Sequence, residues 1–327
     1  MILLDKETLR AQMNSCGLAR RPFLWCVSFN LEKGFLITDP LAQDEVLWRV
    51  GRHGSDLQGS RGAAPRLEVV EPVSPGCYSG MFATIMGGLR RGDSFLANLT
   101  GATEVRCTGS LRDVFLHASA PFRLLIGDEF VCFSPEPFVR ISGRDISTFP
   151  MKGTADASVP GAARELLDDY KETCEHHTIV DLMRNDLNSV AEGVTVSRFR
   201  YLEEITTDSG SILQTSSEIR GTLREEDVMR FGDVIFPLLP AGSITGAPKR
   251  ATVELIERAE SVERGWYTGV FGYFDGEEML TAVMIRCMQR GADGRLYFHS
   301  GGGVTVNSVE QEEYAELMAK VYLSRTP

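Results

Sequence analysis

The chain has 327 residues, of which 43% are hydrophobic, and its formal net charge at pH 7 is −11. This composition predicts a globular protein with a large core, and the acidic balance without a long basic run argues against nucleic acid and anionic membranes as partners. No apolar run approaches the roughly 18 residues that cross a bilayer, and charged residues interrupt the first ten positions, unlike a secretory signal.

The cysteines and histidines are scattered. The seven cysteines are odd in number and form no Cys-x-x-Cys motif, which indicates reduced thiols and a cytoplasmic location. The five histidines show no spacing typical of a zinc site.

The first half of the chain alternates short apolar runs with turn residues. Ser74-Pro75 predicts a helix start, with the helix running to about Arg91. The remaining runs in this half predict strands, at 23–29, 34–38, 46–50, 67–70, 94–99, 122–126, 129–133, 138–141 and 145–149.

The second half has longer polar and amphipathic stretches. These predict helices at 161–189, 224–236, from 247 onward, and from Ser308 as N-cap to about 323. Strands are predicted near 194–201, 211–223, 266–274, 279–287 and 295–299. Strands and helices cluster rather than alternate, so an α+β fold is favoured over a doubly wound parallel sheet, in one large domain.

Two predicted helices carry a Glu-x-x-Glu pair: Glu172 with Glu175, and Glu313 with Glu316. Residues three apart share a helix face, so each pair can direct two carboxylates at one point, and the two faces together would suit a divalent cation. The same spacing also describes an ordinary solvated face. We interpret the repeat at 254–263, which includes Glu260 beside Arg258 and Arg264, as such a face.

Three glycine-containing segments could present backbone amides to an anion: 150–154, 241–249 and 300–304. None fits a P-loop or a dinucleotide-binding fingerprint, and for each segment taken separately a tight structural turn is the favoured interpretation.

A set of segments resembles the chorismate-utilising enzymes, which include the first components of anthranilate and aminodeoxychorismate synthases and the isochorismate and salicylate synthases. The segments occur in the family order and span about 134–320: SPEPF, FPMKGT, ETCEHHTIVDLMRNDL, LLPAGSITGAPKRATVELIE, RGWYTGVFGYF, MIRC, SGGGVTVNS and EEYAELMAK. The resemblance implies two packed, mostly antiparallel sheets flanked by helices. It also implies one chorismate-binding catalytic domain over 1–327, in which 1–90 match weakly and 91–327 form the core.

The resemblance assigns a ligand set as well. It implies Mg²⁺ on Glu175 and Glu316, with Glu172 and Glu313 nearby or acting through water. The metal would hold the ring carboxylate of chorismate, in a pocket completed by Gly153, Thr154, Gly301, Gly302, Gly303 and Lys320. Arg286 and Tyr267 match the residues that hold the enolpyruvyl carboxylate, and arginine suits a bidentate carboxylate contact.

Two positions bear on the reaction. Isochorismate and salicylate synthases have a water-activating lysine that aligns with Leu96 here, which argues against those reactions. Lys152 matches the lysine of aminodeoxychorismate synthases, where anthranilate synthases have alanine. The resemblance implies that Lys152 is the nucleophile at C2 and that Glu136 is the general acid/base. Lys152 must then be neutral, so we expect desolvation or a neighbouring cation to lower its pKa.

The sequence also departs from the family pattern. Gln214 replaces a family histidine, and the segment after Thr154 is short. Because the N-terminal part is short, we expect no tryptophan-inhibition site.

The chain contains neither a Gly-x-Cys-x-Gly elbow nor His-x-Glu, so the hypothesis is that a separate glutamine amidotransferase subunit supplies ammonia. The predicted reaction is amination of chorismate at C4 for folate biosynthesis. The alternatives are anthranilate or 2-amino-2-deoxyisochorismate synthesis, and a catalytically silent binding subunit.

Overall fold

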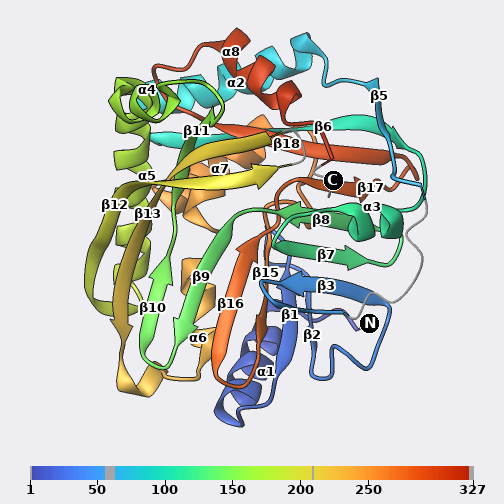
Figure 1. Ribbon diagram of the computed structural model, residues 1–327, viewed down its shortest axis with the longest axis vertical. Coiled ribbons are helices and arrows are strands. Elements are labelled where there is room, and N and C mark those ends of the chain that lie inside the picture. The colour runs from blue at the N-terminus through green and yellow to red at the C-terminus, as the bar shows by residue number, and fades with distance from the viewer. Residues whose placement is uncertain (1, 56–62, 208–209, 324–327) are drawn as a thin grey trace.

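The computed structural model describes residues 2–55, 63–207 and 210–323. Within these residues two nine-stranded sheets pack together, and their strands pair antiparallel (Figure 1). Helices cover the outer faces. This arrangement confirms the predicted fold class.

The first sheet has the order β11-β13-β10-β9-β16-β15-β1-β2, and β12 pairs with β13 at its edge. Its strands are β1 Phe23–Val27, β2 Gly34–Ile37, β9 Pro137–Ser142, β10 Asp145–Thr148, β11 Met151–Asp156, β12 Ala191–Thr207, β13 Gly210–Leu223, β15 Val270–Phe274 and β16 Glu278–Val283.

The second sheet has the order β14-β6-β18-β17-β8-β7-β3-β4, and β5 pairs with β6. Its strands are β3 Val46–Val50, β4 His53–Gly54, β5 Leu67–Glu71, β6 Leu96–Cys107, β7 Phe122–Ile126, β8 Phe130–Ser134, β14 Gly246–Ala247, β17 Cys287–Arg290 and β18 Leu296–Val304.

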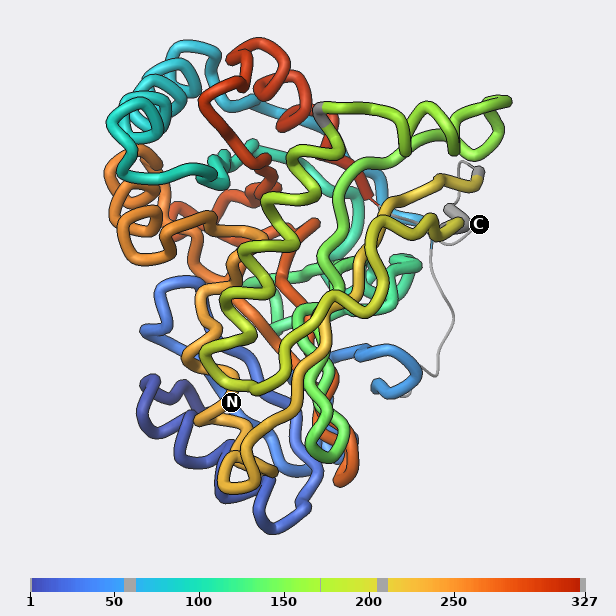
Figure 2. Tube along the Cα trace, turned by 90° about the vertical axis from the view of Figure 1, so that its left-hand side faces the viewer, coloured from blue at the N-terminus to red at the C-terminus, as the bar shows by residue number. Residues whose placement is uncertain are grey.

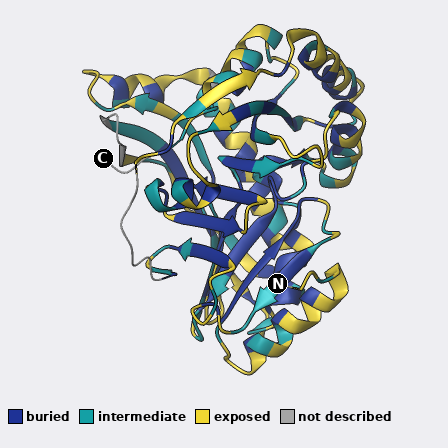
Figure 3. Cartoon of the chain, turned by 90° about the vertical axis from the view of Figure 1, so that its right-hand side faces the viewer, coloured by how far each residue is buried: buried dark blue, intermediate teal, exposed yellow. Residues whose placement is uncertain are grey.

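The core lies between the sheets and under the helices. Along β1, Phe23 and Trp25 face the helix side, whereas Leu24 and Cys26 face the other sheet, as the two-residue repeat of a strand requires. Leu24 and Cys26 belong to the same buried cluster as Trp48 of the second sheet. Each large side chain buried in this way contributes about 1.5–3 kcal/mol of hydrophobic free energy. Figure 3 shows both sheets largely buried and the outer helix faces exposed.

Most helices belong to two groups, and α3 and α4 pack separately. α1 (Lys6–Leu18), α5 (Tyr170–Asn188) and α6 (Phe231–Ile235) contribute to the core beside the first sheet, and α5 runs along β12 and β13 (Figure 2). α2 (Pro75–Arg91), α7 (Lys249–Ala259) and α8 (Glu310–Ala319) form a cluster with β6 and β18. α3 (Leu111–His117) packs on β7 and β8, and α4 (Ala162–Asp168) contacts β11.

The helix from Ser74 is confirmed: Ser74 caps α2 by accepting a hydrogen bond from the Cys77 amide, and Gly92 ends it with a φ of 83°. Two helices were not predicted. α1 begins at the cap Asp5, and α3 begins at a capping box formed by Ser110 and Asp113. Both caps were visible in the sequence, but the apolar pattern after each is weak.

Three predicted helices have different bounds. The helix predicted at 161–189 breaks at Asp169, which adopts an extended conformation, ends α4 and caps α5 by accepting from the Glu172 amide. The helix predicted at 224–236 is wrong: it is replaced by short 3₁₀ turns and the five-residue α6, separated at Met229, where φ is 65°. Ser308 does not cap α8, because its hydroxyl instead accepts from the Thr305 amide.

Two of the predicted amide-presenting loops are strands. Residues 151–156 form β11, which is irregular between Met151 and Thr154, and Gly153 has a φ of 82° there. Residues 300–304 lie in β18, where Gly302 pairs with Leu99 of β6. A β-carbon on Gly301 would lie 2.6 Å from the Thr100 methyl, so the close approach of β6 requires glycine.

Over the described ranges, no helix combines the length and the apolar character needed to cross a membrane.

Candidate active site

A pocket lies where β11, α5, β18 and α8 meet the turn at 241–245. Ligand sites are usually concave pockets with a few converging polar groups. Its walls carry most of the predicted site residues: Glu136, Lys152, Glu175, Tyr267, Arg286, Gly301, Gly302, Gly303, Glu316 and Lys320. Leu96 also lines this pocket.

Lys152 of β11 is paired with Glu175 of α5. The Lys152 Nζ lies 2.6 Å from Glu175 Oε2, and the two side chains are 31% and 18% exposed. Burial acts to lower the pKa of Lys152, but Glu175, together with Glu316 and Glu172, outweighs burial and leaves that pKa above its ordinary value. The predicted lowering is therefore not found in this structure, because three carboxylates stabilise the ammonium.

Lys320, just after α8, is paired with Glu316. Its Nζ lies 2.6 Å from Glu316 Oε1 and donates to the Gly301 carbonyl oxygen at 2.7 Å. Burial lowers the pKa of Lys320, although Glu316 opposes this. The contact is possible because β17 pairs with β18 only as far as His299, so the edge beside the glycines is open to the pocket.

The two Glu-x-x-Glu pairs lie on either side of this pocket. Glu175 and Glu316 line it, while Glu172 lies behind Gly153 and Glu313 lies beside Gly302. A β-carbon on Gly153 would come within 2.8 Å of Glu172 Oε2. Among residues 2–55, 63–207 and 210–323, no three His, Cys, Asp or Glu side chains are arranged to hold a metal ion. The lysine ammonium groups lie against the carboxylates instead.

Glu136 also lines the pocket and follows β8 in the chain. Its Oε1 accepts a hydrogen bond of 2.6 Å from the Ser243 hydroxyl. Burial raises the pKa of the Glu136 carboxyl, and the Ser243 bond and the charges of Arg286 and Lys320 offset this only in part. A carboxyl that retains its proton more strongly than usual is suited to act as a general acid.

Arg286 and Tyr267 complete the wall between the sheets. Arg286 has a φ of 52°, and its guanidinium donates to the Lys320 carbonyl oxygen at 3.5 Å. The Tyr267 ring lies 5.2 Å from the His299 ring, and burial raises the pKa of the Tyr267 hydroxyl. Arg286 thus brings positive charge to the pocket.

Thr154 does not line the pocket. It pairs with Gln214 of β13. The position where the family has histidine therefore lies on the strand next to the one that carries Lys152.

Several pocket residues were not predicted from the sequence: Asn98, Thr178, Ser243 and His299. Ser243 lies within the matched segment LLPAGSITGAPK, so its place in a motif was a signal, but its role needs Glu136 beside it. Thr178 lies three residues after Glu175 on α5, a spacing that could have indicated the same helix face.

The model of the family described as chorismate binding enzyme matches residues 29–324. The chain belongs to the chorismate-binding enzyme family. The match begins well before residue 134, where the quoted motifs begin.

Curated relatives agree with this family. An uncharacterised PabA-like protein of Pasteurella multocida is 46% identical over 316 residues, covering 95% of this chain and 97% of that protein. Aminodeoxychorismate synthase component 1 of Bacillus subtilis is 34% identical, covering 88% of this chain and 69% of that protein. A Haloarcula marismortui anthranilate synthase component 1 is 30% identical, covering 88% of this chain and 58% of that protein.

Solved structures show the same fold. The menaquinone-specific isochorismate synthase from Escherichia coli superposes with a TM-score of 0.74 at 14% identity, covering 98% of this chain and 82% of that one. At this identity the likeness concerns the fold alone.

Behind the pocket of this chorismate-binding enzyme, Arg264 and Glu260 form a buried ion pair. Arg264 Nη2 lies 2.6 Å from Glu260 Oε1, and the side chains are 2% and 5% exposed. The predicted solvated face is therefore wrong for these two residues. Their spacing is the same as on a solvated helix face, but α7 ends at Ala259, and both side chains are directed into the protein beyond that end.

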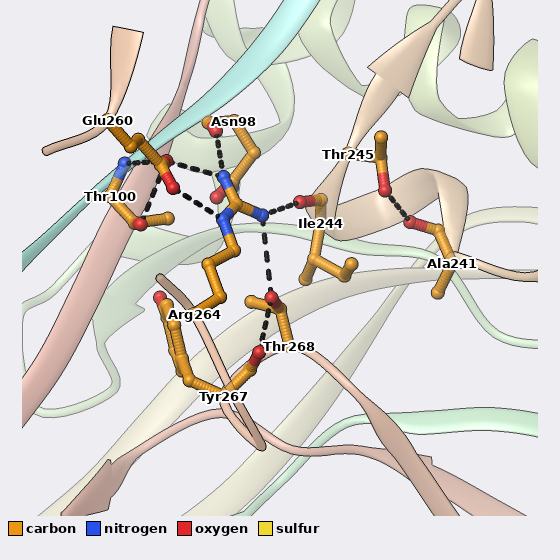
Figure 4. A network of polar contacts seen from close by, with 9 residues as sticks. All are labelled: Asn98, Thr100, Ala241, Ile244, Thr245, Glu260, Arg264, Tyr267 and Thr268. Carbon is orange, nitrogen blue, oxygen red and sulfur yellow. Dashed lines mark hydrogen bonds and ion pairs between the residues drawn. The ribbon is translucent and has the colours of Figure 1, made fainter. Parts of the chain in front are cut away.

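The Arg264 guanidinium joins three segments that line the pocket (Figure 4). It donates to the Ile244 carbonyl oxygen at 2.9 Å, to the Asn98 carbonyl oxygen at 2.6 Å and to the Thr268 hydroxyl at 3.4 Å. Glu260 in turn accepts from the amide and the hydroxyl of Thr100. One buried cation thus fixes β6, the turn at 241–245 and the segment that carries Tyr267.

The first prediction concerns this pair. Arg264→Met removes one partner and leaves a buried carboxylate, so we expect the free energy of unfolding to fall by about 3–5 kcal/mol, measured by urea denaturation. The control is Arg250→Met, which breaks a 3.2 Å pair with Glu254 whose side chains are 94% and 60% exposed; it should change stability by no more than about 1 kcal/mol. Equal losses in both variants would contradict this role.

The second prediction concerns pH. Burial, and then the charge of Arg264, lowers the pKa of the His299 imidazole from 6.5 to about 4. Between these values the unfolded chain binds a proton that the folded chain does not. The free energy of unfolding therefore falls as pH is lowered from ~6.5 toward 4, and it is not reduced by this residue above pH ~6.5. His299→Gln should flatten the pH dependence of the unfolding free energy by up to about 1.4 kcal/mol per pH unit in this window. An unchanged slope would show that folding does not lower the pKa of His299.

Proposed function

We propose that this chorismate-binding enzyme aminates chorismate at C4, which makes it an aminodeoxychorismate synthase component. The observation that carries the proposal is that Lys152 and Glu136, a candidate nucleophile and a candidate acid, line one pocket, while Leu96 stands in the same pocket. Leucine cannot activate water, which disfavours isochorismate formation.

The charges of the pocket suit a dianionic substrate. Besides Lys152, which must be neutral in the proposed reaction, Arg286 and Lys320 bring two cationic groups to the pocket of a protein whose net charge is −11. Arg286 can bind the enolpyruvyl carboxylate with two parallel hydrogen bonds, and Tyr267 lines the same pocket. The Lys320 ammonium and the open edge of β18 at Gly301–Gly303 face the same space, where the ring carboxylate would bind.

The carboxylates fit a magnesium ion. Glu175 and Glu316 would hold it, because Mg²⁺ takes one or two protein carboxylates and keeps several waters. Both are now neutralised by a lysine ammonium, which indicates that the site tolerates positive charge between α5 and α8. When bound, Mg²⁺ would neutralise the carboxylates that hold the proton on Lys152.

The proposed reaction takes place in two successive nucleophilic displacements. Neutral Lys152 Nζ forms a bond to C2, the two ring double bonds shift, and the C4–O bond breaks as Glu136 donates a proton to the leaving hydroxyl, which departs as water. Ammonia next forms a bond to C4, the double bonds shift back, and the C2–N bond breaks to release Lys152 as a neutral amine. The ammonium formed at C4 gives one proton to the Glu136 carboxylate, which restores the acid. The balance is chorismate and ammonia to 4-amino-4-deoxychorismate and water.

Ammonia would come from a separate glutamine amidotransferase subunit, and the product would enter folate biosynthesis in the cytoplasm. The aminodeoxychorismate synthase component of Bacillus subtilis supports this reading more than the anthranilate synthase relatives do, because anthranilate synthases have alanine where this chain has Lys152. A silent binding subunit has no need of both Lys152 and Glu136.

The third prediction is the product. Purified protein with chorismate, ammonium and Mg²⁺ should yield 4-amino-4-deoxychorismate, identified by mass spectrometry and chromatography. Lys152→Ala should lower its rate of formation by at least about a thousandfold, because the covalent step has no substitute nucleophile. The exposed Lys6→Ala is the control and should leave the rate unchanged. Anthranilate as the product, or an active Lys152→Ala enzyme, would contradict the proposal.

The fourth prediction concerns the metal. Glu316→Gln should raise the Mg²⁺ concentration for half-maximal turnover by about tenfold or more and weaken Mg²⁺ binding measured by calorimetry. Glu312→Gln removes an exposed carboxylate from the same helix and should change neither value. If the two variants behave alike, Glu316 does not hold the ion.

A further inference from the structure

Ser243 is the pocket residue in direct contact with the candidate acid, and no motif gave it a role. It lies in the 3₁₀ turn Gly242–Ile244, and its hydroxyl donates to Glu136 Oε1 at 2.6 Å. Both side chains line the pocket. The contact joins segments that are 107 positions apart in the chain.

The turn that carries Ser243 is held from both ends. Arg264 donates to the carbonyl oxygen of Ile244, the next residue, and the Thr245 hydroxyl donates to the Ala241 carbonyl oxygen at 2.8 Å (Figure 4). The turn also has a buried residue on each side of Ser243, at Gly242 and Ile244. The hydroxyl therefore approaches Glu136 from a fixed backbone.

The backbone and the carboxyl group of Glu136 are held by different contacts. Its amide donates to the Ser134 hydroxyl at 3.1 Å, and its carbonyl oxygen accepts from the Val283 amide at 3.2 Å, so its backbone is fixed by neighbours in the sheet. The carboxyl group is separated from that backbone by three rotatable bonds. The Ser243 hydrogen bond restrains this free end.

We propose that Ser243 is a positioning residue, which fixes the Glu136 carboxyl and determines which of its oxygens carries the acid proton; this rests on the proposed role of Glu136. In a neutral carboxylic acid, one oxygen is a hydroxyl donor and the other remains an acceptor. Since Ser243 donates to Oε1, that oxygen is the acceptor, and the proton lies on Oε2. The acid is thereby held in one orientation before the substrate arrives, as efficient proton transfer requires.

A double-mutant cycle tests this role. Wild type, Ser243→Ala, Glu136→Gln and the double variant are compared by the kcat and KM of chorismate consumption with ammonium and Mg²⁺. We expect Ser243→Ala to lower kcat about tenfold with little change in KM, consistent with the loss of one hydrogen bond to a reacting group. In the Glu136→Gln background the same change should cost less than about twofold, and Ser243→Thr, which keeps the hydroxyl, should restore most of the rate.

Ser189→Ala is the matched control, because the exposed Ser189 hydroxyl bonds only locally, to the Asp186 carbonyl oxygen at 2.7 Å on α5. It should leave kcat and KM unchanged. If Ser243→Ala lowers kcat by the same factor with and without Glu136, Ser243 does not act through Glu136 and the proposal is overturned.

The result of this double-mutant cycle can be distinguished from a failure of the proposed function. Product identity tests the reaction, whereas chorismate consumption tests Ser243 whichever product forms. If wild type consumes no chorismate, crystal structures decide: the Glu136 carboxyl should turn away from its wild-type position in Ser243→Ala and keep it in Ser243→Thr. An unmoved carboxyl in Ser243→Ala would overturn the proposal.

Discussion

The ion pair between Lys152 and Glu175 sets the electrostatic state of the whole pocket. Burial favours a neutral amine, but Glu175, Glu316 and Glu172 surround the group and hold its proton. A nucleophilic role needs the opposite state. In the proposed function, a bound Mg²⁺ ion and the Lys152 ammonium would compete for the same carboxylate oxygens. Binding of the metal would therefore also favour the neutral form of Lys152.

The lysine and the acid come from different parts of the scaffold. Lys152 comes from the edge strand β11, Glu136 follows β8, and both line the pocket. Behind it, the buried Arg264 fixes three pocket segments at once, including the turn of Ser243. A cation in the interior is costly unless it is fully bonded, and here its bonds run to segments far apart in sequence. The network thus ties pocket geometry to correct folding.

Local signals in the sequence were sufficient for much of the fold. Ser74-Pro75 indicated the start of α2, and alternating runs indicated most strands, because these features depend on neighbours in the chain. The break at Asp169 and the inward turn of Glu260 depend on what packs against them. Glu260 has the same three-residue spacing as Glu172 and Glu175, yet it is buried against Arg264 rather than lining the pocket. Spacing defines a helix face, but the tertiary structure determines what that face contacts. For the same reason the sequence did not indicate the contact between Ser243 and Glu136, which are far apart in the chain.

Because the fold is shared with an isochorismate synthase at 14% identity, the backbone cannot determine the reaction. When a fold is shared, the chemistry depends on which side chains reach the substrate. In the proposed reaction, Leu96 leaves water at C2 without a base, and the nitrogen of Lys152, which lines the same pocket, would be the nucleophile. The leaving hydroxyl would then receive its proton from Glu136, and the raised pKa of Glu136 would keep that proton available. On this proposal the choice of reaction depends on one apolar side chain, one amine and one carboxyl whose orientation Ser243 fixes.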